Sequence, residues 1–123
     1  MKIIIQRVSS AKVEIKKLLK GQIKQGYLIL LGITETDTKE DIEWLVNKIT
    51  NLRIFSDDTG KMNLSIKDID GEILLISQFT LFASTKKGNR PSFIKSAKPD
   101  VAIPLYGQFI KTLSQKLGKP IET

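Results

Sequence analysis

The sequence predicts an α+β fold, a largely antiparallel β-sheet or barrel covered by two α-helices, and three observations lead to this prediction. Short apolar and β-branched runs outnumber helical patterns by roughly three to one. Several of these runs follow one another at the spacing of hairpins, without a helix between them. The chain has 123 residues, the usual size of one domain. We therefore expect residues 1–123 to form a single domain.

Four strands are predicted in the first third of the chain. Residues 3–8 are rich in isoleucine and valine, which favour an extended backbone. Residues 12–15 alternate polar and apolar side chains, and residues 18–23 can pair with them across a turn at residues 16–17. The run 26–33 is apolar and bounded by glycines, which is typical of a strand buried on both faces. We place that strand at the centre of the sheet.

The first helix is predicted to start after Thr38, because Thr38 and Asp41 have the spacing of a capping box. Its apolar positions recur at intervals of three and four, which places them on one face. Trp44 lies off that face, so we expect its indole to point partly outward. The apolar stripe consists of Ile42, Leu45, Val46 and Ile49.

The second half of the chain predicts two strands, a basic loop and a helix. The strands are residues 52–55 and 72–79, and residues 85–91 form the loop. The helix runs from about Asp100, with Pro104 in its first turn, to a stop at Gly118 and Pro120. Its buried face steps by four residues along Leu105, Phe109, Leu113 and Leu117.

Composition excludes several kinds of chemistry. The chain has no cysteine and no histidine, which removes disulfides, Cys/His zinc sites, thiolate nucleophiles and mechanisms that need an imidazole. No run approaches the roughly 20 apolar residues of a membrane span, and the apolar start of the chain is too short for a signal peptide. We expect a cytoplasmic protein.

Charge is distributed in blocks. The net charge is +7, but residues 1–34 and 73–123 each carry +6, whereas residues 35–72 carry −5. No acidic residue lies between Glu72 and Asp100. Clustered cations attract polyanions, so nucleic acid or a phosphorylated ligand is one interpretation; lysines that only solubilise the surface are the other. The cations of the second block include Lys86, Lys87, Arg90, Lys95 and Lys98.

A polar group interrupts the last apolar strand. Ser77, Gln78 and Thr80 stand between apolar residues at the point where the strand leads into the basic loop. Burying such groups without partners costs about 1–3 kcal/mol each, so their partners are either backbone groups in a bend or a ligand. Nearby Phe79 and Phe93 could stack nucleic-acid bases, whereas we place Phe82 in the core.

Two other site types are disfavoured. The spacing of four aspartates lacks the order of a calcium loop, so we interpret them as turn residues and predict no metal site. No glycine pattern of a phosphate-binding loop follows a strand. The four aspartates are Asp57, Asp58, Asp68 and Asp70.

Seven segments of the chain together form a specific pattern. They lie at residues 6–13, 31–32, 51–55, 60–65, 77–83, 87–93 and 104–106, and the most distinctive is Ser77-Gln78-Phe79-Thr80. In order and spacing they resemble the D-aminoacyl-tRNA deacylases of the bacterial and eukaryotic type, which hydrolyse the ester that joins a D-amino acid to the 3′ end of tRNA. Ser77-Gln78-Phe79-Thr80 matches the first signature of that family.

The resemblance implies a homodimer of small antiparallel barrels, whose pockets lie at the subunit interface and receive the aminoacylated 3′ end of tRNA. It implies that Ser77, Gln78, Phe79 and Thr80 form the catalytic pocket, and that Arg7 helps to fix a loop entering from the partner subunit. It further implies that the cations Lys86, Lys87 and Arg90 hold the acceptor stem. The family uses no metal and no cofactor; its catalysis is attributed to positioning, backbone amides, a hydroxyl and the 2′-OH of the tRNA.

The sequence departs from the family near its end. The family's second signature, an Asn-x-Gly-Pro-Val-Thr segment with a Gly-cis-Pro dipeptide that excludes L-amino acids, has no counterpart up to Thr123. Two interpretations stay open: the segment follows Thr123 in a longer chain, or this is a short variant without that chirality filter. Residues 15–18 also lack the Asp-Gly turn usual in the family.

Three functional hypotheses follow. The first is hydrolysis of D-aminoacyl-tRNA, with glycyl-tRNA as a further substrate because glycine has no side chain to reject. The second is a tRNA- or nucleic-acid-binding module without hydrolysis. The third is a dimeric scaffold with neither activity.

Overall fold

A computed structural model describes all residues 1–123, and it confirms the mixed α+β class with two helices. The core sheet has the order β1-β4-β7, from strands β1 (Lys2–Val8), β4 (Gly26–Gly32) and β7 (Glu72–Ser77). Strand β4 is central, as its apolar run predicted. It pairs antiparallel with β1 and parallel with β7. The three-stranded sheet is therefore mixed and, within one chain, open; the other two strand pairs of the molecule are antiparallel.

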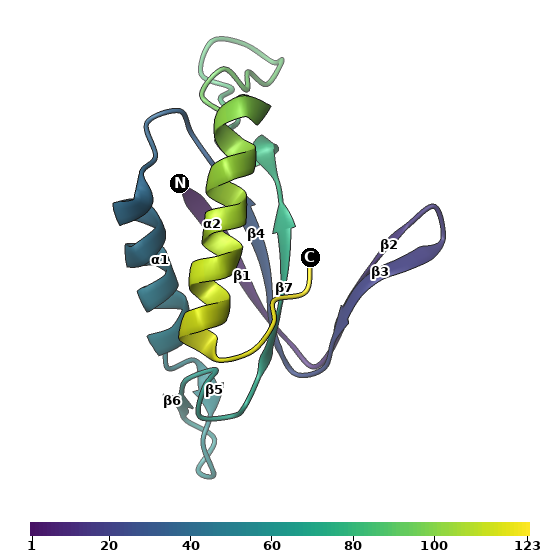
Figure 1. The fold of residues 1–123 in the computed structure, drawn as a ribbon, viewed down its shortest axis with the longest axis vertical. Coiled ribbons are helices and arrows are strands. Elements are labelled where there is room, and N and C mark those ends of the chain that lie inside the picture. The colour runs from purple at the N-terminus through teal and green to yellow at the C-terminus, as the bar shows by residue number, and fades with distance from the viewer.

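Two further strand pairs flank this sheet. The hairpin of β2 (Ala11–Ile15) and β3 (Leu18–Ile23) matches the prediction and projects from the body of the molecule (Figure 1). Its turn residues Lys16 and Lys17 both adopt positive φ, 52° and 66°, which is the geometry of a type I′ turn. The short pair of β5 (Phe55–Ser56) and β6 (Met62–Leu64) corrects the prediction of a strand over residues 52–55.

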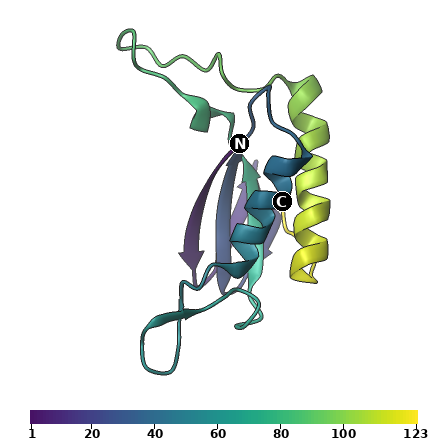
Figure 2. The same cartoon turned by 90° about the vertical axis from the view of Figure 1, so that its left-hand side faces the viewer.

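Both helices lie on one face of the sheet and leave the other face without a helix (Figure 2). Helix α1 (Lys39–Asn51) starts where the capping box predicted: the Asp41 carboxylate accepts a hydrogen bond from the Thr38 backbone N–H at 2.8 Å. Trp44 is 63% exposed, in agreement with its position off the apolar stripe. The apolar stripe faces the sheet, as expected.

Helix α2 (Pro99–Leu117) begins one residue earlier than predicted, with Pro99 in its first turn. Pro104 therefore stands in the second turn, which corrects its expected place in the first. Pro104 has no N–H to donate, but it and Asp100 are exposed, so water can satisfy the carbonyl of Asp100. The helix ends at Gly118, whose φ is +81°, as predicted.

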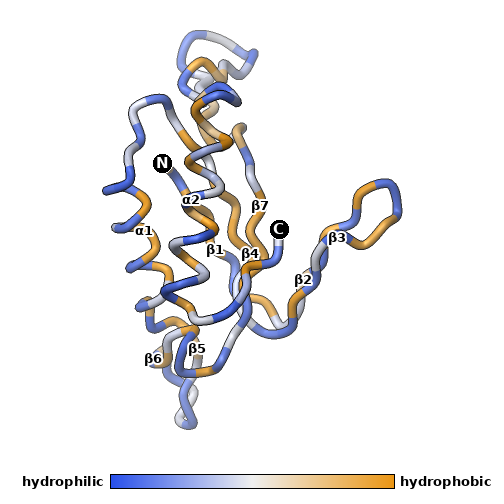
Figure 3. Tube along the Cα trace, in the orientation of Figure 1, coloured by the Kyte–Doolittle hydropathy of each residue, from blue (hydrophilic) through white to orange (hydrophobic).

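The core lies between the helices and the sheet, and its apolar stretches follow β4, β7 and the inner helix faces (Figure 3). Alternate residues of each strand point into it, as the period of a strand requires. The opposite, helix-free face carries Ile4, which is 51% exposed, and the half-buried Leu28 and Leu30. The strands contribute Ile3, Ile5, Tyr27, Ile29, Leu31, Ile73 and Leu75 to the core side.

The parallel pair β4–β7 starts at a close approach of two backbones. A Cβ atom built on the buried Gly26 would lie 1.8 Å from the Glu72 carbonyl oxygen. Glycine is the residue that lets the strands meet here. The Glu72 N–H donates to the carbonyl of Gln25 at 3.0 Å.

Two aspartates close turns, as predicted. The Asp57 carboxylate accepts hydrogen bonds from the N–H groups of Thr59 and Lys61 at 2.9 and 3.1 Å. Asp68 accepts one from the Ser65 N–H at 2.9 Å. These bonds lower the pKa of both carboxyl groups, led by the Thr59 hydroxyl for Asp57 and by the Ser65 backbone for Asp68.

Neither helix has the length and apolarity together that crossing a bilayer requires.

Candidate functional site

The candidate site lies where β4 and β7 end. Because these strands are parallel, their carboxyl ends meet at the same edge of the sheet. Ser77 is the last residue of β7 and stands opposite Leu31, and the Gln78 N–H donates to the Leu31 carbonyl at 2.8 Å. The chain then turns into a short 3₁₀ helix, η1 (Phe79–Phe82). The strand predicted over 72–79 thus ends two residues early.

The polar groups of this segment face each other or the surface. Ser77 is exposed, whereas Gln78 and Thr80 are half-buried. The Gln78 side-chain amide donates a hydrogen bond to the Thr80 hydroxyl oxygen. The oxygen of the Gln78 side-chain amide and the proton of the Thr80 hydroxyl therefore stay available to a ligand. Residues 77–80 contain no titratable side chain, so the segment offers hydrogen-bond donors and acceptors but no general base.

Gly32 allows η1 to pack closely against the end of β4. A Cβ atom at Gly32 would lie 3.0 Å from the Leu81 Cβ, 3.2 Å from the Gln78 carbonyl oxygen and 3.2 Å from the Phe82 ring. These distances are tighter than ordinary van der Waals contact. The position of Gln78 and η1 therefore depends on a glycine in the neighbouring strand.

Phe79 connects the polar segment to the basic loop. Its ring is 58% exposed and meets Phe93 edge-on, with ring centroids 5.5 Å apart. The Ser96 hydroxyl donates to the Phe79 carbonyl at 2.7 Å. Phe82, expected in the core, is only half-buried and lies outside it, with Lys2 Nζ 4.8 Å from its ring centroid. The physical reason is that η1 lies past the end of the sheet.

The structure brings the predicted cations Lys86, Lys87 and Arg90 together. Their loop is closed by two reciprocal backbone hydrogen bonds of 2.8 Å between Ser84 and Ser92. The loop surrounds a hollow of about 470 Å³. No carboxylate lines this hollow, so its positive charge is uncompensated. The lining residues are Ser84, Lys86, Lys87, Arg90, Ser92, Ile94 and Lys95.

Arg7 lies elsewhere in the same chain. It pairs with Tyr27 across β1 and β4, four residues along β4 from Leu31, which is about 13 Å at the rise of a strand. Its guanidinium donates to the Ile54 carbonyl at 2.5 Å. Burial raises the pKa of Tyr27 to about 12, and the Arg7 charge opposes that rise. Within one chain, Arg7 is thus separated from Ser77–Thr80.

Sequence reasoning missed two residues at this site. Lys2 reaches η1, with its ammonium 3.5 Å from the Leu81 carbonyl. Its position at the start of β1, which pairs antiparallel with β4, places it beside the carboxyl end of β4 and could have indicated this contact. The Tyr106 hydroxyl donates to the Leu75 carbonyl at 3.2 Å. Burial raises the pKa of Tyr106, and a hydrogen bond from the Ser77 backbone opposes the rise. Tyr106 thereby binds the outer edge of β7 two residues before Ser77, beside the backbone hydrogen bonds that join this edge to Glu122.

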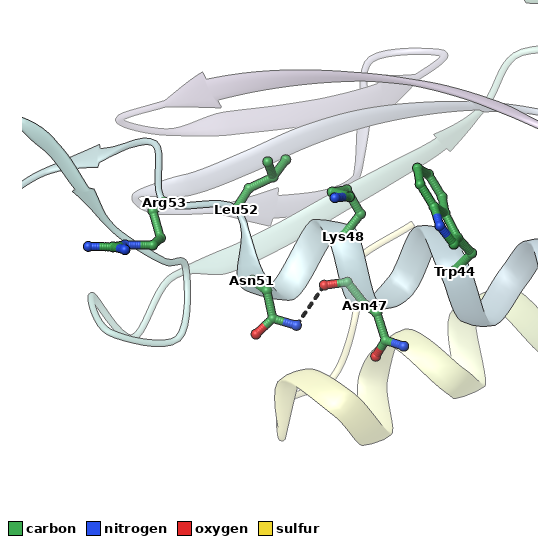
Figure 4. Close-up of a pocket in the computed structure, with 6 residues that line it drawn as sticks. All are labelled: Trp44, Asn47, Lys48, Asn51, Leu52 and Arg53. Carbon is green, nitrogen blue, oxygen red and sulfur yellow. Dashed lines mark hydrogen bonds between the residues drawn. The ribbon is translucent and has the colours of Figure 1, made fainter.

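A second hollow, of about 380 Å³, lies on the outer face of α1 and contains none of the predicted site residues (Figure 4). Lys48 Nζ lies 5.3 Å from the Trp44 ring centroid. Arg53 is bound to Asn63, through its Nε to the backbone carbonyl at 2.9 Å and through its Nη2 to the side chain. The lining residues are Trp44, Asn47, Lys48, Asn51, Leu52 and Arg53.

Comparisons with known proteins agree with the expected family. The family model described as D-Tyr-tRNA(Tyr) deacylase matches residues 4–123. The chain is 60% identical to the D-aminoacyl-tRNA deacylase of Bacteroides fragilis strain YCH46 over 123 residues, which is all of this chain and 82% of the relative. It is 54% identical, with the same coverage, to the D-aminoacyl-tRNA deacylase of Flavobacterium johnsoniae.

Two solved structures share the fold. The c-Myc DNA Unwinding Element Binding Protein is 39% identical, with a TM-score of 0.88 over 94% of this chain and 77% of that chain. A probable eukaryotic D-amino acid tRNA deacylase is 16% identical, with a TM-score of 0.81 over 94% and 68% of the two chains; at that identity the likeness concerns the fold alone. With its sequence matched from residue 4 to its end, this chain belongs to the D-Tyr-tRNA(Tyr) deacylase family.

Proposed function

We propose that this protein hydrolyses the ester bond of D-aminoacyl-tRNA. The observation that carries the proposal is the 54–60% identity to D-aminoacyl-tRNA deacylases over the full 123 residues. In the reaction, water adds to the ester carbonyl and the bond from that carbon to the ribose oxygen breaks. The products are a free D-amino acid and a tRNA with its 3′-terminal hydroxyl restored. Charged tRNA is a cytoplasmic substrate, which supports that location for the enzyme.

Residues Ser77–Thr80 hold the ester in this proposal. Supporting it, the segment lies at an exposed strand end and combines a free amide oxygen, a hydroxyl and an exposed aromatic ring. Without a titratable group, its contribution is to position the carbonyl and donate hydrogen bonds to the developing oxyanion. Removal of one such donor typically costs about 10²–10³ in kcat. Thr80 is a weaker candidate for a covalent nucleophile, because no base in the segment can take its proton.

The loop cations Lys86, Lys87 and Arg90 bind the acceptor end of the tRNA. The uncompensated charge of the 470 Å³ hollow supports this assignment, as does its connection to Phe79 through Phe93 and Ser96. Contacts with phosphates position a nucleic acid but do not discriminate among its attached groups. The loop therefore contributes affinity, whereas residues 77–80 act on the ester.

A homodimer completes the site. The helix-free face of the sheet leaves Ile4 half-exposed, and apolar surface of this kind is a frequent feature of interfaces between subunits. Ser77 and Phe79 are exposed in a single chain, and Arg7 lies about 13 Å along the strand from them. A second copy can enclose the segment and bring a further residue to it. Sedimentation equilibrium tests this: a mass near twice 13.8 kDa is expected, and a monomer at the assay concentration contradicts it.

The activity is tested by incubating the protein with D-tyrosyl-tRNA and L-tyrosyl-tRNA and following loss of the ester. We expect rapid loss from the D-form and little loss from the L-form. Glycyl-tRNA is the third substrate, and its hydrolysis is expected because glycine presents no side chain to exclude. Equal rates for the D- and L-forms would contradict chiral selection, and no loss from any of the three would contradict the enzyme.

A nucleic-acid-binding module without hydrolysis is the second candidate. The name of a 39% identical structure, a protein that binds a DNA unwinding element, favours it, as does the basic loop. Under this alternative the same assay shows no ester loss, while tRNA or DNA binds with an affinity that falls steeply with salt concentration.

A further inference from the structure

Two lysines occupy a strained turn at the tip of the β2–β3 hairpin. Lys16 and Lys17 have φ of 52° and 66°, a left-handed conformation that costs stability in any residue with a side chain. Asn-Gly or Asp-Gly adopts the same type I′ geometry at a lower cost. Both lysines are exposed, and neither forms an ion pair. Nothing inside the molecule therefore requires lysine at either position.

The rest of the hairpin adds further cations without counter-charges. Residues 11–24 contain five lysines and one carboxylate, Glu14, which pairs with Lys12 at 3.0 Å. The other lysines form no ion pair. They extend over seven residues from the base to the tip, or about 23 Å at the rise of a strand. Charges spread over that length favour an extended polyanion over a single small anion. These unpaired lysines are Lys16, Lys17, Lys20 and Lys24.

The base of the hairpin is packed against the strand that leads into the candidate site. A Cβ atom built on the buried Gly21 of β3 would lie 3.2 Å from the Leu74 side chain of β7. Four residues of β3 and three of β7 then separate the tip from Ser77, which is about 23 Å along the strands. A nucleic-acid duplex carries one phosphate per strand about every 3.4 Å, so roughly seven phosphates span this path. A tRNA with its 3′ end at Ser77 is long enough to reach the tip.

We propose that Lys16 and Lys17 form a second tRNA-binding contact, which holds phosphates of the double-stranded part of the tRNA. The hairpin and the loop that carries Lys86, Lys87 and Arg90 project from the body in different directions (Figure 1), so the two contacts are separate. The strained turn places two ammonium groups at one projecting point. The hairpin adds affinity and takes no part in breaking the ester. This inference rests on the proposed action on tRNA.

The test removes the charge of the turn in two ways. Lys16→Asn/Lys17→Gly removes both charges and supplies the preferred residues of a type I′ turn, so its Tm is expected to rise by about 3–6 °C. Lys16→Gln/Lys17→Gln removes the charges, keeps the strain and is expected to stay within about 2 °C of the parent. A first variant no more stable than the parent would overturn the inference at the turn itself. The matched control is Lys111→Gln/Lys116→Gln, which removes two exposed, unpaired lysines of α2.

Filter binding of uncharged tRNA measures the contact. At 0.15 M salt we expect both tip variants to bind about tenfold more weakly than the parent, with the slope of log K against log salt reduced by about 1–2. The control is expected to stay within about twofold. An oligonucleotide of the last four nucleotides of the tRNA is too short to reach the tip, so parent and variants bind it equally. Parental tRNA affinity in both tip variants, an equal loss in the control, or an equal loss for the oligonucleotide would overturn the contact.

Combining the two sets of substitutions tests whether the contacts are separate. Added to Lys86→Ala/Lys87→Ala, either tip variant is expected to bring the loss of affinity to about 100-fold, because distant, independent contacts add in free energy. A combined loss of only tenfold would overturn a second contact. With D-tyrosyl-tRNA as substrate, the tip variants raise KM about tenfold and keep kcat. A loss in kcat with an unchanged KM would also overturn it.

Two other occupants of the tip are outcomes of the same comparison. If the turn binds a second copy of the chain, the tip variants change the mass found by sedimentation equilibrium. If it binds anionic lipid, they lose binding to phosphatidylserine vesicles and keep their tRNA affinity. Either result overturns the tRNA contact.

Binding and turnover together separate this inference from the deacylase function. A parent that binds tRNA through the turn but releases no amino acid contradicts the function and supports the contact. A parent that hydrolyses D-tyrosyl-tRNA, with parental tRNA affinity in both tip variants, contradicts the contact and leaves the function standing.

Discussion

The two ends of the three-stranded sheet differ in how their polar groups are satisfied. At the end near β5 and β6, the Asp57 carboxylate accepts the Thr59 hydroxyl and two N–H groups from its own turn. At the other end, Lys86, Lys87 and Arg90 surround a hollow without any carboxylate. A turn that satisfies its own charge has little left for a ligand, whereas clustered like charges favour binding of an anion. The uncompensated charge therefore supports the proposed placement of tRNA binding at the end of the sheet near Lys86, Lys87 and Arg90.

The largest expected difference between the ends is in hydroxyl removal. Thr80→Ala is expected to lower kcat on D-tyrosyl-tRNA by roughly 100-fold, because it removes a donor and frees the Gln78 amide. Thr59→Ala removes a hydroxyl of the same type from the Asp57 turn and is expected to leave kcat unchanged. Single-turnover ester loss measures both. A Thr80→Ala rate equal to that of the parent shows that the hydroxyl has no chemical role.

Charge removal gives the next effect. The double variant Lys86→Ala/Lys87→Ala is expected to weaken tRNA binding roughly tenfold at 0.15 M salt and to reduce the slope of log K against log salt by about 1–2. The D/L preference stays the same, because phosphate contacts do not read the amino acid. Lys61→Ala/Lys67→Ala at the opposite end is the control and is expected to bind tRNA normally. Filter binding over a salt series distinguishes the two, and a changed stereochemical preference would contradict the division of roles.

Glycine substitutions produce a smaller difference. Gly32→Ala places a methyl group 3.0 Å from Leu81 and is expected to lower kcat about fivefold by displacing η1, since close-packed neighbours shift only partly. Gly107→Ala in α2 meets nothing within 4 Å; it is expected to keep kcat and to raise the free energy of unfolding by about 0.5–1 kcal/mol. A wild-type kcat in Gly32→Ala would show that the rate does not depend on the close packing of η1 against Gly32.

The smallest expected effects concern two tyrosines, the buried Tyr27 and the half-buried Tyr106. The Tyr27 hydroxyl has no hydrogen-bond partner, so Tyr27→Phe is expected to be neutral or stabilising by about 1 kcal/mol. Tyr106→Phe loses the bond to Leu75 and is expected to be destabilising by about 1 kcal/mol. Urea unfolding at pH 7 measures both free energies. If the free energy of unfolding rises or stays the same in Tyr27→Phe and falls in Tyr106→Phe, only the Tyr106 hydroxyl contributes to stability. A fall in Tyr27→Phe would contradict this expectation.

Tyr27 also sets an alkaline limit. Its folded pKa of about 12 lies above the ordinary value of 10.0, so the unfolded chain loses this proton first as pH rises. The stability that depends on neutral Tyr27 is therefore complete below pH 10 and lost as pH rises from 10 towards 12. Tyr27→Phe is expected to flatten the fall in the free energy of unfolding over this range. If the free energy of unfolding falls equally in Tyr27→Phe and in the parent, groups other than Tyr27 cause the fall.

Local patterns predicted the elements well, because each depends on neighbouring residues. The apolar run 26–33 identified the central strand, and Thr38 with Asp41 fixed the start of α1. The same patterns failed where distant backbone decides. Residues 52–54 have the composition of a strand, but pairing with another strand begins only at Phe55. Strand β7 ends at Ser77, because the Gln78 N–H donates to the Leu31 carbonyl and the chain then turns into η1.

The candidate site could be identified from the sequence only in part, for the same reason. Ser77–Thr80 and Lys86–Arg90 are each continuous in sequence; a polar break in an apolar strand indicates the first segment, and a run of cations without carboxylates indicates the second. Which of them meet depends on the parallel register of β4 and β7, and no local pattern encodes that register. The separation of Arg7 from Ser77 likewise followed only from the strand pairing.

Gly26 has a consequence for how this sequence can change. Its neighbour Glu72 leaves no volume for any side chain, so position 26 admits one amino acid if β4 and β7 are to stay aligned. A shift of that alignment by one residue would turn each side chain of β7 to the opposite face and would carry Ser77 away from Leu31. The missing side chain of Gly26, at the opposite end of β4, thus helps to fix the register that places Ser77, the first residue of the candidate segment, opposite Leu31.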